Sequence, residues 1–314
     1  MKKKLVAGAV TLLSVVTLAA CANGTNKDIV TMKGDTITVS DFYNEIKSNQ
    51  GAQQVLFQMT INKVFEKEYG SKVSDKEVDK ELAKQKKQLG NQFDAYLAQQ
   101  GLTEETAKKQ IRSNMLLEYA VNQAAKKDIK ESDYKAAFES YTPEVTAQII
   151  KLDSEDKAKE VLEAAKAEGA DFAQIAKDNS TDTATKDKGG EVKFDSGTAG
   201  IPSQVKEAAF KLDENGISDV ITVSAGQNYS ASYYIVKLNK KTEKGSDWKK
   251  YEKRLKEIIV DGRKQDTNYI RSIIAKAMTN ANIKVKDDAF KSTFNQYLQN
   301  IGVQTSDSSS SSKK

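Results

Sequence analysis

The chain has 314 residues and a formal net charge of +5; 30% of its residues are charged and 38% hydrophobic, enough to bury a core. It has no histidine and one cysteine, which excludes Ser-His-Asp and Cys-His catalysis, histidine-containing zinc sites and an internal disulfide. Loss of Lys2, Lys3 and Lys4 with a signal peptide would lower the net charge to +2, too little to suggest nucleic acid binding. We therefore expect no metal, no cofactor and no nucleic acid partner.

The first residues are typical of a bacterial lipoprotein signal. Lysines after Met1 precede an apolar run from Leu5 to Val16, too short to span a bilayer, and then Leu18-Ala19-Ala20-Cys21. This ending resembles a lipobox, whose cysteine receives a diacylglycerol and begins the mature chain. Two acyl chains anchor stably, because each buried methylene contributes about 0.8 kcal/mol. We expect Cys21 to hold the chain on the extracytoplasmic face of the cell membrane; an ordinary signal peptide with an incidental cysteine is the alternative.

A hairpin and a helical array follow. Two short apolar runs around Lys33-Gly34-Asp35 predict the hairpin, and Ser40 is the expected N-cap of the next helix. Ser74 with Glu77, and Thr103, predict two further helix starts. The helical array is expected to run from Ser40 to about Tyr141.

Thr142-Pro143 interrupts the helical pattern, and a small α+β domain is predicted from there to about Lys240. Its expected elements are a strand at 145–152, helices at 156–168 and 172–178, a glycine-rich loop at 189–200, a helix at 203–210, and strands at 217–223 and 233–238.

Helical spacing returns after residue 240. One apolar stripe runs from Trp248 to Ile259 and continues from Tyr269 to Met278, which predicts one long helix packing on the N-terminal ones. The α+β domain would then be inserted into a helical domain built from both ends of the chain.

Five stretches of the middle segment carry a resemblance to a known family. They are residues 145–150, 169–176 with Gly-x-Asp-Phe-Ala, 188–192 with Gly-Gly, 207–212 and 233–238. In this order they resemble the parvulin family of peptidyl-prolyl isomerases, and the whole chain resembles PrsA-type foldase lipoproteins of Gram-positive bacteria. The fold class expected is α+β, a parvulin-like βαααββ domain inserted into a helical chaperone domain.

The expected domain limits follow from these patterns. They are a signal peptide at 1–20, a lipidated tether at 21–33, an N-terminal helical chaperone domain at 34–142, the parvulin-like domain at 143–241, C-terminal helices at 242–302 packing on the N-terminal domain, and a disordered Ser-rich tail at 303–314.

The resemblance implies a pocket whose usual side chains are replaced in this chain. Parvulin pockets hold two histidines, a Cys or Asp, and a Met and a Phe that cradle the proline ring. The matching positions here are Gln148, Tyr234, Thr183, Ile201 and Val205, in that order. Gln148 and Tyr234 are expected to hydrogen-bond each other across adjacent strands. With this degenerate pocket, the expected isomerase activity is weak or absent.

Three functions remain open on the sequence. The first is a membrane-anchored foldase that binds unfolded exported polypeptides, with Phe57, Ile61, Phe65 and Trp248 as candidate client-binding residues and core packing as their alternative role. The second is an active peptidyl-prolyl cis-trans isomerase. The third, a solute-binding lipoprotein, fits the lipobox but not a helical chain with a single small sheet. Whether two copies pair as a homodimer is left open.

Overall fold

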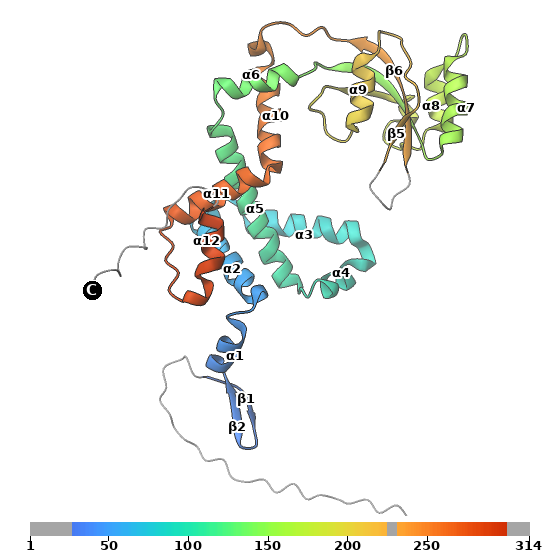
Figure 1. The fold of residues 1–314 in the computed structure, drawn as a ribbon. Helices are drawn as coiled ribbons and strands as arrows, with labels where there is room; N and C mark the ends of the chain where they lie inside the picture. Colours follow the sequence, from blue (N-terminus) through green and yellow to red (C-terminus); the bar gives the residue numbers. More distant parts are fainter. Residues whose placement is uncertain (1–26, 225–230, 300–314) are drawn as a thin grey trace, which may run out of the picture. The chain divides into compact units, whose positions relative to one another are not determined.

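The structure is a computed structural model that describes residues 27–224 and 231–299 (Figure 1). The chain divides into two compact units, one of residues 1–68 with 274–314 and one of residues 69–273. The predicted boundaries after residues 142 and 241 fall inside the second unit, and they stay predictions. The lipobox, the tether up to residue 26 and the tail from residue 300 lie outside the described residues.

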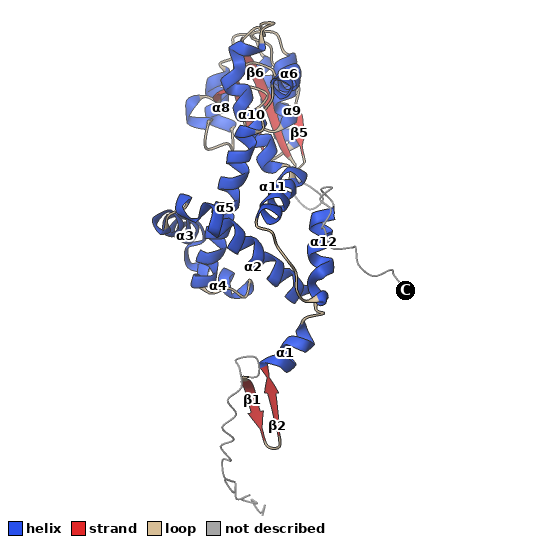
Figure 2. Cartoon of the chain, turned by 90° about the vertical axis from the view of Figure 1, so that its left-hand side faces the viewer, coloured by secondary structure: helices blue, strands red, loops and turns tan. Residues whose placement is uncertain are grey.

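The first unit begins with the expected hairpin (Figure 2). Strands β1 (Asp28–Met32) and β2 (Asp35–Thr38) pair antiparallel around Gly34, whose φ of +88° suits the turn. β1 thus lies within the range 21–33 that was assigned to the tether. The expected N-cap at Ser40 is wrong, because helix α1 (Val39–Ile46) is capped two residues earlier by Thr38, in a capping box with Asp41.

Residues 50–68 and residues 274–299, which lie far apart in the sequence, meet in the first unit. Helix α2 (Gln50–Tyr69) runs from it into the second, while helix α12 (Lys291–Gln299) and the later part of α11 (Thr267–Asn280) belong to it. The rings of Phe57 and Phe294 make an edge contact with centroids 5.4 Å apart. Gln53 donates to the Ala289 carbonyl and accepts from Thr293, so polar contacts also join the two segments.

Within its described residues, the second unit contains five whole α-helices outside the sheet domain, and two of them start at the expected caps. The five are α3 (Asp75–Leu89), α4 (Phe93–Gln99), α5 (Glu104–Lys127), α6 (Glu131–Ser140) and α10 (Glu252–Gln265). The capping box of Ser74 with Glu77 and the cap at Thr103 are confirmed. The single C-terminal helix is wrong: α10 ends before Asp266, which accepts from the backbone of Asn268 and so starts α11.

A four-stranded antiparallel sheet forms the centre of the α+β part. Its strands are β3 (Val145–Leu152), β4 (Glu191–Phe194), β5 (Ile221–Val223) and β6 (Ser232–Lys241), in the order β4-β3-β6-β5. Helix α9 (Ser203–Lys211) lies on one side of it, and α7 (Glu155–Lys166) and α8 (Phe172–Asn179) lie on the other (Figure 1). The expected α+β class is confirmed.

The structure adds strand β4, which the sequence analysis assigned to the glycine-rich loop. Its four residues are too few for alternation to stand out, and Glu191 and Lys193 break any apolar run. A second difference concerns the expected strand at 217–223, which is regular only from Ile221 and otherwise keeps a single bridge at Ile217.

Gly190 permits the close approach of β4 to β3. Its φ is +79°, and a Cβ there would lie 2.6 Å from the Ile149 carbonyl oxygen. The Gly190 carbonyl accepts from the Ile149 amide at 2.9 Å. No side chain fits between these two backbones.

The sheet separates two apolar clusters. Val145, Ala147 and Ile149 of β3 face α9, while Ile150 and Leu152 face α7 and α8. No helix among residues 27–224 and 231–299 is both long and apolar enough to cross a membrane.

Gly190→Ala is expected to destabilise the second unit by at least about 3 kcal/mol, because it adds left-handed strain of about 1–2 kcal/mol to a clash with backbone. Urea unfolding followed by the fluorescence of Trp248, the single tryptophan, measures this. Gly169→Ala is the matched control, since Gly169 has a φ of +75° but nothing within 4 Å of a new Cβ. Equal losses in the two variants would contradict the close-approach argument.

Candidate functional site

The candidate site is the side of the sheet that faces α9, called here the α9 face. Eight buried residues form it: Val145, Ala147, Ile149, Phe194, Val205, Ala209, Val236 and Leu238. Half-buried apolar side chains pack along its margin, among them Ile201, Ile221, Val223 and Tyr234. Partly open apolar side chains of this kind suit a small apolar group such as a proline ring.

Three of the five expected pocket positions meet on the α9 face. Val205 of α9 is fully buried against the sheet, while Ile201 and Tyr234 are half-buried at the margin. Ile201 comes from the segment before α9, Val205 from its first turns and Tyr234 from β6. The structure therefore brings Ile201, Val205 and Tyr234 together on one face of the sheet.

Gln148 does not join them. It lies between Ala147 and Ile149, which both face α9, so the alternation of the strand turns it to the opposite side of the sheet. There its amide donates to the Gly189 carbonyl at 2.9 Å. Its register partner on β6 is Lys237, three positions from Tyr234. The expected Gln148–Tyr234 hydrogen bond is wrong, because the two side chains lie on opposite faces.

Thr183 is exposed in the loop after α8. Its neighbour Asp182 accepts from the Thr185 hydroxyl at 2.6 Å and from the Ala184 amide, so this carboxylate shapes the loop. Among the described residues no three Asp, Glu or Cys side chains are grouped so that they could hold a metal ion.

The four expected client-binding residues are buried or half-buried instead of exposed to a client. Phe57, Ile61 and Phe65 are buried on α2, and the half-buried Trp248 stacks on Tyr134 with ring centroids 5.1 Å apart. Periodicity identified the apolar side of α2 correctly, but it cannot tell a covered side from an open one.

A different group of apolar side chains is exposed, and the sequence analysis missed it. We call it the N-terminal apolar surface; it consists of Ile29, Val30, Met32, Ile37, Val39, Phe42, Tyr43, Val55 and Met59. Phe42, Val55 and Met59 are 53%, 59% and 51% exposed, which is unusual for side chains of this size. The i, i+3, i+4 spacing of Val39, Phe42 and Tyr43 was the available signal.

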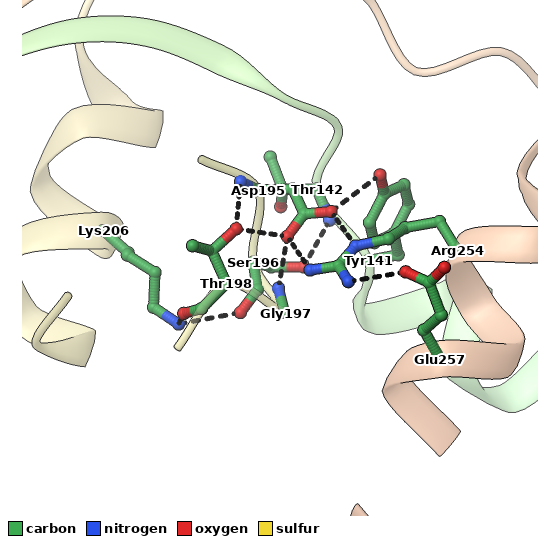
Figure 3. Close-up of polar contacts among 9 residues, drawn as sticks. All are labelled: Tyr141, Thr142, Asp195, Ser196, Gly197, Thr198, Lys206, Arg254 and Glu257. Carbon is green, nitrogen blue, oxygen red and sulfur yellow. Dashed lines mark hydrogen bonds and ion pairs between the residues drawn. The ribbon is translucent and has the colours of Figure 1, made fainter. Parts of the chain in front are cut away.

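A buried carboxylate lies next to the α9 face, where β4 ends (Figure 3). Asp195 is 6% exposed and accepts two hydrogen bonds from Arg254 of α10, from Nε at 2.6 Å and from Nη2 at 2.8 Å. The Tyr141 hydroxyl and the Thr198 hydroxyl also donate to it, at 3.2 and 2.9 Å. No sequence signal marked this pair, whose members are 59 residues apart.

The charge on Asp195 is well compensated. Burial by itself would raise the pKa of this carboxyl, but hydrogen bonds from Arg254 and Thr198, with the guanidinium charge, lower it from 3.8 to about 2. Burial, together with the neighbouring Asp195, raises the pKa of Tyr141. Asp195 therefore stays ionised, and Tyr141 stays protonated as a hydrogen-bond donor.

Known proteins resemble this chain over its whole length. A family model described as Rotamase: PPIC-type PPIASE domain matches residues 122–240. The "Foldase protein PrsA" of Streptococcus sanguinis strain SK36 is 62% identical over 96% of this chain and 90% of its own length, and that of Streptococcus gordonii strain Challis is 60% identical over 100% of both.

Solved structures of PrsA proteins are also similar to this chain. The crystal structure of foldase protein PrsA from Streptococcus pneumoniae has a TM-score of 0.79 at 55% identity, covering 86% of this chain and 99% of its own. The PrsA structure from Lactococcus lactis has a TM-score of 0.66 at 39% identity, with 86% and 99% covered.

Asp195→Asn is expected to lower the free energy of unfolding by roughly 2 kcal/mol at pH 7, because the folded-state pKa of Asp195 is depressed. Such a group stabilises the fold fully above its ordinary pKa of 3.8, and its contribution is lost as the pH falls toward about 2. Urea unfolding of both proteins between pH 7 and pH 2.5 measures the difference. A difference that stays constant over this range would contradict the assignment.

Proposed function

The chain belongs to the PrsA family of foldase proteins, and on that basis we propose that it assists the folding of exported polypeptides mainly by binding them while they are unfolded. The foldase function and the parvulin-type isomerase domain come with the family. The mechanism, the membrane anchor and the clients are the finer parts of the proposal.

The observation that carries the proposal is the N-terminal apolar surface. Unfolded polypeptides expose apolar side chains, which bind weakly to any open apolar surface of a folded protein. Strands β1 and β2 form a two-stranded sheet whose side chains are largely exposed, and α1 has no buried residue. An extended client segment could also pair with a free edge of such a hairpin.

The earlier candidates Phe57, Ile61 and Phe65 are not part of this proposal, because their burial leaves no area for a client. A second copy of the chain is the competing occupant of the same surface, and it would make the protein a homodimer. We do not propose the solute-binding alternative, since the similar proteins are foldases over the full length of the chain.

Phe42→Ser combined with Val55→Ser is expected to raise the protein concentration needed to suppress client aggregation by about thirtyfold, since each substitution loses roughly 1 kcal/mol of apolar contact. Light scattering of a denatured exported protein diluted into the mature chain measures it. Tyr96→Ser is the control, because Tyr96 is 46% exposed but lies outside the surface. Unchanged suppression would contradict the proposal, and a change from dimer to monomer in light-scattering mass would assign the surface to a second copy.

Isomerase activity is expected to be weak or absent. Prolyl isomerisation twists a partial double bond over a barrier of about 20 kcal/mol, so it needs a shaped slot and polar groups that favour the twisted state. On the α9 face Val205 is fully buried and Ile201 is half-buried, so Ile201 is the one of the two that offers apolar area to a proline ring. Valine in place of a phenylalanine ring removes roughly 1–3 kcal/mol of contact, and Gln148 lies on the other face.

The mature chain is expected to accelerate a proline-limited refolding reaction little above the uncatalysed rate. Tyr234→Phe and Gln148→Ala are expected to leave that rate unchanged, because neither side chain completes a polar network on the α9 face. Strong acceleration that both substitutions abolish would favour the alternative, a catalytically active isomerase.

The lipobox supports a location at the extracytoplasmic face of the cell membrane. A lipid on Cys21 would keep a weak binder at high local concentration near polypeptides that leave the secretion channel.

Cys21→Ala is expected to release or misprocess the protein and to slow the folding of exported clients, while the thermal unfolding of the two units stays the same. Cell fractionation with client activity assays measures both effects. Full client folding by an untethered form at equal abundance would contradict the anchoring role.

A further inference from the structure

The segment that carries Ile201 into the α9 face has little regular structure of its own. It runs from Asp195, directly after β4, to Pro202, directly before α9. Its order therefore depends on contacts with other parts of the chain. Both flanking elements are anchored in the same apolar cluster, through Phe194 of β4 and Val205 of α9.

Polar contacts within the segment converge on Asp195 (Figure 3). The Gly197 amide donates to Oδ1 at 3.0 Å, and the Thr198 hydroxyl donates to the same oxygen while accepting from the Asp195 amide. Lys206 of α9 donates to the Ser196 and Thr198 carbonyls at 2.9 and 3.0 Å. The carboxylate thus holds the turn on which Ile201 depends.

The carboxylate is itself held from outside the sheet domain. Arg254 of α10 makes a bidentate pair with it, and the guanidinium also donates to Glu257 on the same helix. Tyr141, which donates to Asp195, packs its ring on Tyr251 at a centroid distance of 5.4 Å. A bidentate pair fixes orientation as well as distance.

Close packing also joins the 195–202 segment to α10. A Cβ on Gly197 would lie 2.4 Å from Cγ1 of Ile258, one turn after Arg254 on α10. The segment therefore rests directly on this helix. Arg254 lies beyond residues 122–240, the part that matches the isomerase domain family.

We propose that Arg254 is a positioning residue for the candidate proline-binding face: by holding Asp195 it fixes the 195–202 segment and the position of Ile201. The shape of the α9 face is then set by a helix outside the isomerase domain. A fragment limited to 143–241 lacks both Arg254 and Tyr141, and it leaves a buried carboxylate without its cation. The assignment of this face to proline binding rests on the proposed function, while the positioning of the segment does not.

The test uses the mature chain with Arg254→Met, which keeps most of the side-chain length and removes the charge. Hydrogen exchange of the amides at 196–201 is expected to rise by about tenfold or more, with strands β3 and β6 unchanged. The methyl resonances of Ile201 are expected to shift. Arg263→Met is the matched control: this residue is on the same helix, but its guanidinium donates to Ala125, Asp128 and Asp133 instead of to the 195–202 segment.

Rescue separates positioning from a general loss of stability. Asn at 195 needs no cation but still accepts from Gly197 and Thr198, so Asp195→Asn combined with Arg254→Met is expected to restore slow exchange at 196–201 and most of the Ile201 shift. Unchanged exchange in Arg254→Met, or equal loosening in Arg263→Met, would overturn the proposal.

A proline-containing tetrapeptide added to the wild-type chain tests the face itself. Perturbation of the Ile201 methyls that weakens in Arg254→Met supports positioning for proline binding. If the peptide perturbs no residue of the α9 face in the wild-type chain, that face does not bind proline. The proposed role of Arg254 in shaping a binding site is then overturned. The hydrogen-exchange data still decide whether Arg254 orders the 195–202 segment.

Discussion

The antiparallel pairing of β3 with β6 is the constraint on which the rest of the sheet domain depends. It joins residues 145–152 to residues 233–241, so the chain between them must fold back over both sides of the sheet. Because successive side chains of a strand point to opposite sides, β3 supplies both apolar clusters. The same alternation puts Gln148 and Tyr234 on opposite faces.

In this geometry the parvulin-like fold does not depend on polar groups at the margin of the α9 face. The apolar contacts of Val205, Val236 and Leu238 hold α9 on the sheet whatever polar groups lie at the margin. Removing pocket side chains therefore need not cost the fold. The proposed client binding through the exposed side chains of residues 29–59 would depend on none of these groups.

The Asp195–Arg254 pair connects the sheet domain to the helices. A buried carboxylate without a cation would destabilise the fold, so the charge of Asp195 favours the arrangement in which Arg254 of α10 lies next to the end of β4. The pair gives a physical reason to study the domain within the intact chain rather than as a fragment.

The sequence by itself determined the local elements: strand 145–152, the caps at Ser74 and Thr103, the hairpin at Gly34 and the family resemblance all depend on neighbouring residues. Only the tertiary structure decided which side of α2 is covered and which face of the sheet Gln148 occupies. It also decided that the four residues after Gly190 form a strand and that Asp195 pairs with Arg254. These features depend on contacts between residues far apart in the chain. Residue spacing shows which side chains share a face, but not what lies against it.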